Sequence, residues 1–262
     1  MVSEMSLPLK RQRYVILGFL LAVAAVAWSF LIWQSVMARQ SMGPGMNMQA
    51  PLFFLVMWVV MMAAMMFPTA APMILTFHRV QVDKQQRGQS FVSTWVFVAA
   101  YMLVWALFGI VAFLAATGIQ MVIKVSMISM EMTARLGGVV LIGAGVYQLT
   151  PLKTVCLTKC QTPLSFILTS WRDGVGGAFW MGAKHGAFCL GCCWLLFVIL
   201  FPIGIMNVAA MAVITVVIFA EKSLPFGNRI AQIAALGLIA YGLLAIVVPS
   251  TLPTYMQSPS GM

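Results

Sequence analysis

Seven stretches of this chain are long and apolar enough to cross a lipid bilayer, and this property decides its fold class. They cover residues 14–36, 52–75, 91–115, 135–151, 178–201, 204–220 and 230–249. Of the 262 residues, 62% are hydrophobic and 8% are charged, which is more apolar surface than a soluble domain of this size can bury. We therefore expect an all-α transmembrane helix bundle of about seven spans, with six also possible because the fourth and sixth stretches are short.

The 15 Lys and Arg residues give this bundle an orientation. With the N-terminus inside, all of them fall in cytoplasmic segments except Arg39, Lys124 and Arg135. Such a bias follows the positive-inside rule, so we predict a cytoplasmic N-terminus and an outward-facing C-terminus. The same distribution explains the net charge of +10, so membrane lipid is an expected partner and nucleic acid is not.

The chain is expected to form one membrane domain. We predict a cytoplasmic N-terminal segment at 1–13, a single transmembrane domain at 14–249 and a short outward-facing tail at 250–262. The first stretch could instead be a cleaved secretory signal. Its apolar run continues to Trp33, which is longer than a signal usually requires, so we expect an uncleaved helix.

The fifth apolar stretch carries a concentration of soft metal ligands. On a helix, Met181, His185, Cys189 and Cys192 fall within roughly 80° of one another, and Cys193 lies just beside them. Thiols and an imidazole on one face inside a membrane predict a metal site. The alternative is that the cysteines pack a helix interface and that the histidine is hydrogen-bonded to another helix.

The spacing of the cysteines leaves two further alternatives. Cys189 and Cys192 form a C-x-x-C pair, which also occurs in thiol redox enzymes, but predicted burial favours metal binding over disulfide exchange. Cys156 and Cys160 lie in a predicted cytoplasmic loop, where an ordinary reduced pair is the favoured interpretation and a metal transit point the other.

Methionine is the second unusual feature, with 22 residues in clusters. Met57, Met61 and Met65 follow an i, i+4, i+8 stripe on the second stretch, where they either fill the core or help to bind metal. Further methionines occupy the predicted outward segments: Met37, Met42, Met46, Met48, Met121, Met127, Met130 and Met132. Thioethers bind soft cations without losing a proton, so outward clusters suit Cu(I) in an oxidising compartment.

The ligand types favour Cu(I) as the metal. Zinc accepts Cys and His but gains little from Met, and calcium and magnesium are excluded because they prefer oxygen ligands. Haem is less favoured because His78, the other histidine, lies at the cytoplasmic end of the second stretch. Zinc and haem are therefore weaker alternatives.

Small and charged residues suggest how such a site could be assembled. Gly182 and Gly186 form a G-x-x-x-G pattern that could bring the methionine stripe against the cysteine face. Lys184 could offset thiolate charge. Glu221 and Lys222 end the sixth stretch, where we expect a snorkelling ion pair, the alternative being a proton or metal relay.

Two long motifs carry a family resemblance. The runs from Met57 to Pro72 and from Met181 to Trp194, together with Glu221 and Lys222, resemble a bacterial family of predicted metal-binding integral membrane proteins. Some members of that family are regarded as membrane copper chaperones for tyrosinase-type copper oxidases. The resemblance implies copper, a bacterial cytoplasmic (inner) membrane and a client copper oxidase or other cuproenzyme.

We therefore expect a chaperone that binds Cu(I) through Cys189, Cys192, Cys193 and His185, with Met181 on the same helix face. The methionines of the second stretch, Met57, Met61 and Met65, are expected to contribute further ligands. We do not expect it to catalyse a reaction. Three alternatives remain: a metal permease, a membrane thiol or metal oxidoreductase, and a structural member of a larger membrane complex.

Overall fold

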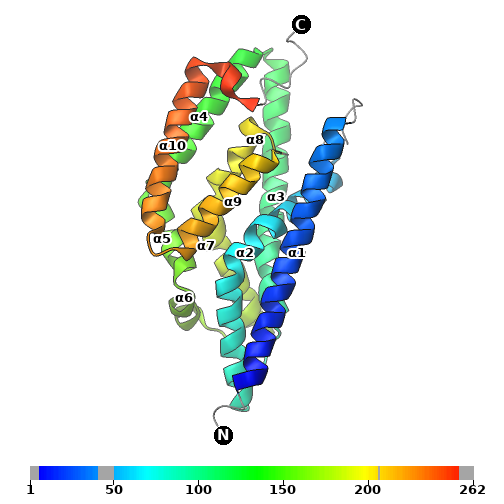
Figure 1. Cartoon of the computed structure of the whole chain (residues 1–262), viewed down its shortest axis with the longest axis vertical. Helices are drawn as coiled ribbons and strands as arrows, with labels where there is room; N and C mark the ends of the chain where they lie inside the picture. The colour runs from blue at the N-terminus through cyan, green and yellow to red at the C-terminus, as the bar shows by residue number, and fades with distance from the viewer. Residues whose placement is uncertain (1–5, 41–49, 206, 254–262) are drawn as a thin grey trace.

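The computed structural model describes residues 6–40, 50–205 and 207–253, and these residues form helices and no strands (Figure 1). The long helices are α1 (Ser6–Gln40), α2 (Pro51–Gln86), α3 (Thr94–Val125), α4 (Met130–Gln148), α7 (Gly174–Val198), α9 (Val208–Ser223) and α10 (Gly227–Val247). Short helices connect them: α5 (Pro151–Gln161), α6 (Pro163–Ser170), α8 (Leu200–Ile203) and the 3-10 turn η1 (Pro249–Thr251). The all-α prediction is confirmed.

Five of the described helices are long and apolar enough to cross a membrane: α1, α2, α3, α10, and α7 together with α8. A sixth span results if α4 and α5, which meet at an angle of 63°, count as one broken segment. Helix α9 has 16 residues, which is short for a straight span. The count of seven spans and the orientation therefore stay predictions. Residues 1–5 and 254–262, and with them parts of the predicted N-terminal segment and outward tail, lie outside the described residues. So do the predicted outward positions Met42, Met46 and Met48.

The connection from α7 to α9 falls where the sequence separates the stretches 178–201 and 204–220. Helix α8 contains Pro202 and is followed by Gly204, whose backbone φ is 111°. Residues with a Cβ rarely adopt this backbone conformation. The chain can reverse there because glycine tolerates that conformation.

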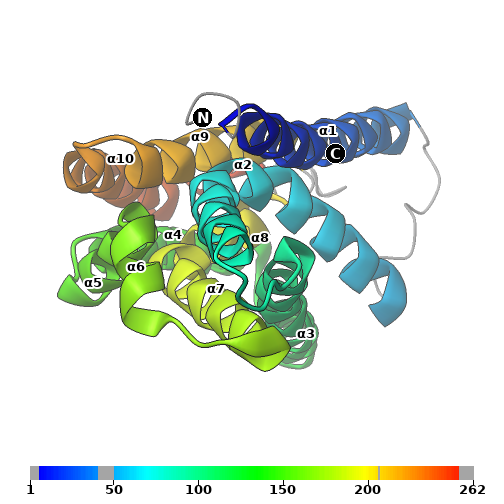
Figure 2. The ribbon, with the colours of Figure 1, turned by 90° about the horizontal axis from the view of Figure 1, so that it is seen from below.

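Helices α5 and α6 occupy the segment that the sequence predicted as a loop. Thr150 caps α5, because its hydroxyl accepts a hydrogen bond from the Lys153 backbone amide, and Pro151 and Pro163 begin the two helices. Seen from below in Figure 2, α7 lies between α3 and α5, and both neighbours pack against it. Cys160 on α5 thereby comes next to the cysteines of α7.

Small residues set the spacing between α3 and α7. A Cβ at Gly182 would collide with the Phe97 carbonyl oxygen of α3, and one at Gly186 would lie 3.0 Å from the Val104 Cβ. The G-x-x-x-G motif therefore serves contact with α3, and the expectation that it brings α2 against α7 is wrong.

An exposed ion pair joins the end of α2 to the start of α7. Lys84 donates a hydrogen bond to Asp173, the residue that precedes α7. This hydrogen bond, with a second one from the Trp171 indole, lowers the pKa of Asp173. The contact therefore holds at neutral pH and is lost on acidification, when the carboxyl group becomes protonated.

A pair of glycines makes the α4–α10 contact close, and this gives a stability prediction. A Cβ at Gly242 would lie 2.7 Å from the Gly138 backbone oxygen, whereas one at Gly237 would meet nothing within 4 Å. We expect Gly242→Leu to lower the free energy of unfolding by about 1–3 kcal/mol, because the larger side chain forces the helices apart. Denaturant titration in detergent measures this, and Gly237→Leu on the same helix is the control that should unfold like the wild type. Equal losses in both variants would show that close packing of α4 and α10 is not the cause.

Candidate metal site

The ligand-bearing face of α7 is buried in the bundle. Met181, His185, Cys189, Cys192 and Cys193 are each at most 2% exposed. Their helical spacing and their burial are therefore as predicted, and these side chains face protein, not lipid.

Cys189 is the point at which four helices meet. Its Sγ lies 3.1 Å from the Tyr101 hydroxyl of α3 and accepts a hydrogen bond of 3.0 Å from the Lys222 Nζ of α9. The Met66 Sδ of α2 lies 4.0 Å away. A sulfur atom, a positive charge and a hydroxyl group therefore surround this thiol.

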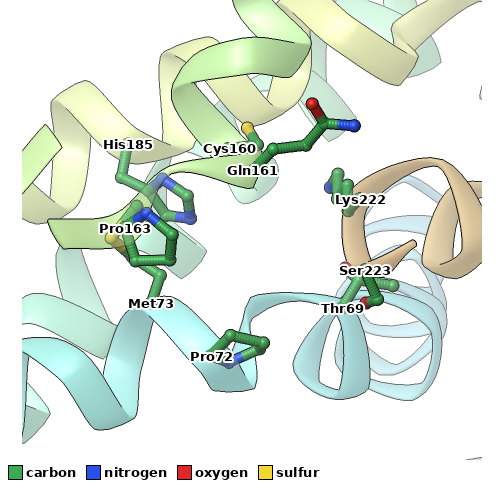
Figure 3. A pocket seen from close by; sticks show the side chains of 9 residues that line it. All are labelled: Thr69, Pro72, Met73, Cys160, Gln161, Pro163, His185, Lys222 and Ser223. Carbon is green, nitrogen blue, oxygen red and sulfur yellow. The ribbon is translucent and has the colours of Figure 1, made fainter. Parts of the chain in front are cut away.

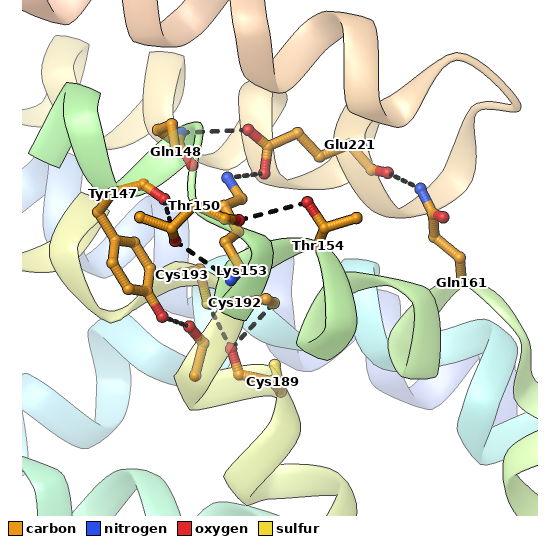
Figure 4. A network of polar contacts seen from close by, with 11 residues as sticks. Tyr147, Gln148, Thr150, Lys153, Thr154, Gln161, Cys189, Cys192, Cys193 and Glu221 are labelled. Atoms are coloured by element: carbon orange, nitrogen blue, oxygen red, sulfur yellow. Dashed lines mark hydrogen bonds and ion pairs between the residues drawn. The ribbon is translucent and has the colours of Figure 1, made fainter.

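Three other cysteines gather around Cys189. The thiols of Cys192 and Cys193 donate hydrogen bonds of 3.1 and 2.8 Å to the Cys189 backbone oxygen (Figure 4). Cys160 of α5 is buried close to the Cys189 and Cys192 side chains. Within the described residues no three His, Cys, Asp or Glu side chains are already grouped to hold an ion. To share one ion, the thiols of Cys192 and Cys193 would have to rotate away from the carbonyl oxygen that they contact.

His185 lies one turn before Cys189 in an aromatic environment. Its ring stacks on Phe97 and Tyr101 at centroid distances of 6.0 and 5.5 Å, and Phe166 meets it edge-on. The buried Nδ1 has no hydrogen-bond partner in the part of the chain that the structure describes. A free imidazole nitrogen at this depth is available to bind a ligand.

A cavity of about 170 Å³ lies beside His185 (Figure 3). Its walls come from α2, from the α5–α6 turn, from α7 and from the end of α9: Thr69, Pro72, Met73, Cys160, Gln161, Pro163, His185, Lys222 and Ser223. The cavity therefore reaches the thiol cluster through Cys160 and Lys222.

The methionine stripe is buried but does not supply the observed contact. Met57, Met61 and Met65 are at most 5% exposed on α2, and Met66 makes the contact with Cys189. One residue advances the helix by about 100°, so Met65 and Met66 point in different directions. Metal binding by Met57, Met61 and Met65 stays a prediction.

The buried charges are paired differently from the sequence prediction. Glu221 accepts hydrogen bonds from Lys153 at 2.8 Å and from Gln148 at 3.2 Å, so the expected Glu221–Lys222 ion pair is wrong (Figure 4). Lys222 turns to Cys189 instead. Lys184, predicted to offset thiolate charge, donates to the Ser170 hydroxyl. The reason is geometric, because residues 221 and 222 point about 100° apart on α9.

Sequence reasoning missed Tyr101 and gave Met66 no contact with Cys189. It singled out Lys222, a lysine at the end of a mostly apolar helix, but expected Glu221 as its partner. Tyr101 and Met66 carry no comparable signal, because aromatic residues and methionine fill most membrane cores.

A family of known proteins matches this chain over the whole of that site. The sequence model of the family PpoB2, described as "Copper chaperone", matches residues 55–245. The chain belongs to this copper chaperone family. No curated protein and no solved structure matches it. Membership in a copper chaperone family indicates copper binding and delivery to copper-requiring proteins, and the matched region includes every residue of α7 and its contacts from α2, α3, α5 and α9.

Proposed function

We propose that this protein binds Cu(I) inside the membrane at the buried thiols around Cys189 and passes it to a client cuproenzyme. The observation that carries the proposal is the position of the Cys189 Sγ, which contacts the Met66 thioether and lies within reach of Cys160. Cys192, Cys193 and His185 lie within one turn of it on α7. In a copper chaperone family, this is the set of donors that a soft ion prefers.

The surroundings favour a monovalent soft cation. Thiolate, thioether and imidazole donors select Cu(I), whereas zinc would make little use of Met66. Lys222 places a positive charge 3.0 Å from the Cys189 sulfur and compensates a thiolate in an apolar environment. A Cu(I) ion bound by two thiolates would carry one net negative charge, which Lys222 would neutralise.

Transfer would proceed by ligand exchange. The site offers more soft donors than one Cu(I) ion needs, so the ion can gain a new sulfur before it leaves an old one and keeps its oxidation state. The client that the family resemblance implies is a tyrosinase-type copper oxidase, and the implied membrane is the bacterial cytoplasmic membrane. In this function the protein is a carrier and not an enzyme.

Metal analysis of purified protein tests the proposal. After anaerobic loading with Cu(I), we expect copper in the wild type and its near-complete loss when Cys189, Cys192 and Cys193 are all replaced by serine. Equal copper in both proteins would remove the proposed site, and zinc in the wild type would change the metal. Copper accumulation inside sealed proteoliposomes would indicate a permease, whereas transfer to an external apo-cuproenzyme without such accumulation supports the chaperone.

A further inference from the structure

The cavity beside His185 has exposed residues at its edge and soft donor side chains in its interior. Ser223 and Pro72 on its rim are exposed, whereas Met73, His185 and Cys160 inside are at most 8% exposed. In Figure 3, His185 and Met73 lie at one end of the cavity, and Lys222 and Ser223 lie at the other. A space with this lining can admit a small cation complex and offer it sulfur and nitrogen donors at depth.

Two observations connect the cavity to a ligand. His185 lines the cavity, and its Nδ1, which is buried beside that space with almost no accessible surface, has no hydrogen-bond partner within the described chain, so a turn of the ring would free it to bind an ion. The Met73 thioether lines the same space, and it would bind a soft metal without losing a proton.

Cys160 joins the cavity to the thiol cluster. It lines the cavity together with Lys222, whose Nζ contacts the Cys189 sulfur, and it is buried close to Cys189 and Cys192. An ion held by Met73 and His185 can therefore move to Cys160 and then to Cys189 by replacing one donor at a time. Lys222 borders the same path and contacts the Cys189 sulfur at its end.

We infer that this cavity is the uptake site for Cu(I), in which Met73 and His185 capture the ion and Cys160 relays it to Cys189. The inference rests on the proposed function, and it adds the route by which a thiol-bound Cu(I) complex gives up its ion. Copper stays Cu(I) throughout. A cysteine that binds the ion from its thiol form releases one proton, and one already present as a thiolate, such as Cys189 beside Lys222, releases none. Each donor thiolate that loses the ion and becomes a thiol takes one proton up.

The test follows Cu(I) uptake by the full chain in detergent under anaerobic conditions. The ion is supplied as its coloured bicinchoninate complex, and loss of colour gives both the rate and the final amount of copper bound. We expect Met73→Leu to lower the rate of copper uptake about tenfold, because the substitution removes one weak ligand. The final amount of copper bound should not change. Ser223→Trp, which narrows the exposed rim, is expected to slow uptake likewise. Met211→Leu removes a buried methionine of α9 that does not line the cavity and should behave like the wild type.

The outcomes separate this inference from the proposed function. Wild-type uptake rates in both Met73→Leu and Ser223→Trp would overturn the uptake route while leaving the copper site intact. A lower final amount of copper in Met73→Leu would assign Met73 to the holding site and overturn its separate role. If the wild type itself took up no copper, the proposed function would fail and this inference with it.

Discussion

Replacing Cys189 alone with serine is expected to weaken Cu(I) binding by more than about 100-fold. Loss of a residue that only supports a metal ligand lowers metal affinity by about 10–100-fold. Cys189 is itself a proposed ligand, and the other proposed donors lie around it. Its Sγ contacts Met66 and Lys222 and lies within reach of Cys160. A serine hydroxyl can still accept the hydrogen bond from Lys222 but carries no negative charge, so we expect some loss of stability together with the loss of the soft donor.

Competition with a chromophoric Cu(I) chelator measures this change in affinity. Cys156→Ser is the comparison variant: Cys156 lies on α5 one turn before Cys160 and packs against Gly191 of α7, but it does not line the cavity and makes no described hydrogen bond to the Cys189 sulfur. Circular dichroism and gel filtration should show that both variants fold. Copper affinity that is unchanged in Cys189→Ser, or equally reduced in Cys156→Ser, would contradict a site centred on Cys189.

The second large effect is expected from the buried ion pair between α5 and α9. Lys153 and Glu221 are each 1% exposed in their side chains and lie 2.8 Å apart. Lys153→Met would leave the Glu221 carboxylate buried with only Gln148 as a side-chain partner among the described contacts. We expect the free energy of unfolding to fall by about 3–5 kcal/mol, the usual cost of removing one partner of such a pair.

A double variant distinguishes loss of the pair from loss of packing. Lys153→Met combined with Glu221→Gln removes both charges, so it should recover most of the stability lost in the single variant. Lys159→Met on the same helix is the control, with an expected change within about 0.5 kcal/mol. Denaturant titration in detergent micelles gives all four values. A double variant as unstable as Lys153→Met would argue against an uncompensated charge as the cause.

Periodicity and hydropathy predicted the helices and the buried face of α7, because both depend on sequence neighbours. Residues four apart, such as His185 and Cys189, share a helix face wherever that helix packs. The pairing of helices could not be predicted in this way. The Gly182–Gly186 motif indicated a close neighbour, but nothing in its spacing distinguished α3 from α2.

The contribution of α5 was missed for a physical reason. Its sequence is mixed in polarity and short, so neither membrane length nor a strong apolar period marks it as a packed helix. Cys160 consequently seemed to belong to a loop, although it lies beside Cys189. The partners of Glu221 and Lys222 could not be predicted either, because they depend on where α5 and α7 meet α9.

The Lys153–Glu221 pair also constrains the order in which the protein can be assembled. The two partners are 68 residues apart in the chain, so Lys153 leaves the ribosome well before the carboxylate that compensates it. Until α9 is made, a hydrocarbon environment is unfavourable for that ammonium group. We therefore expect the segment containing α5 to dock only after α9 has been made, so that the interior around Cys189 closes late in biogenesis.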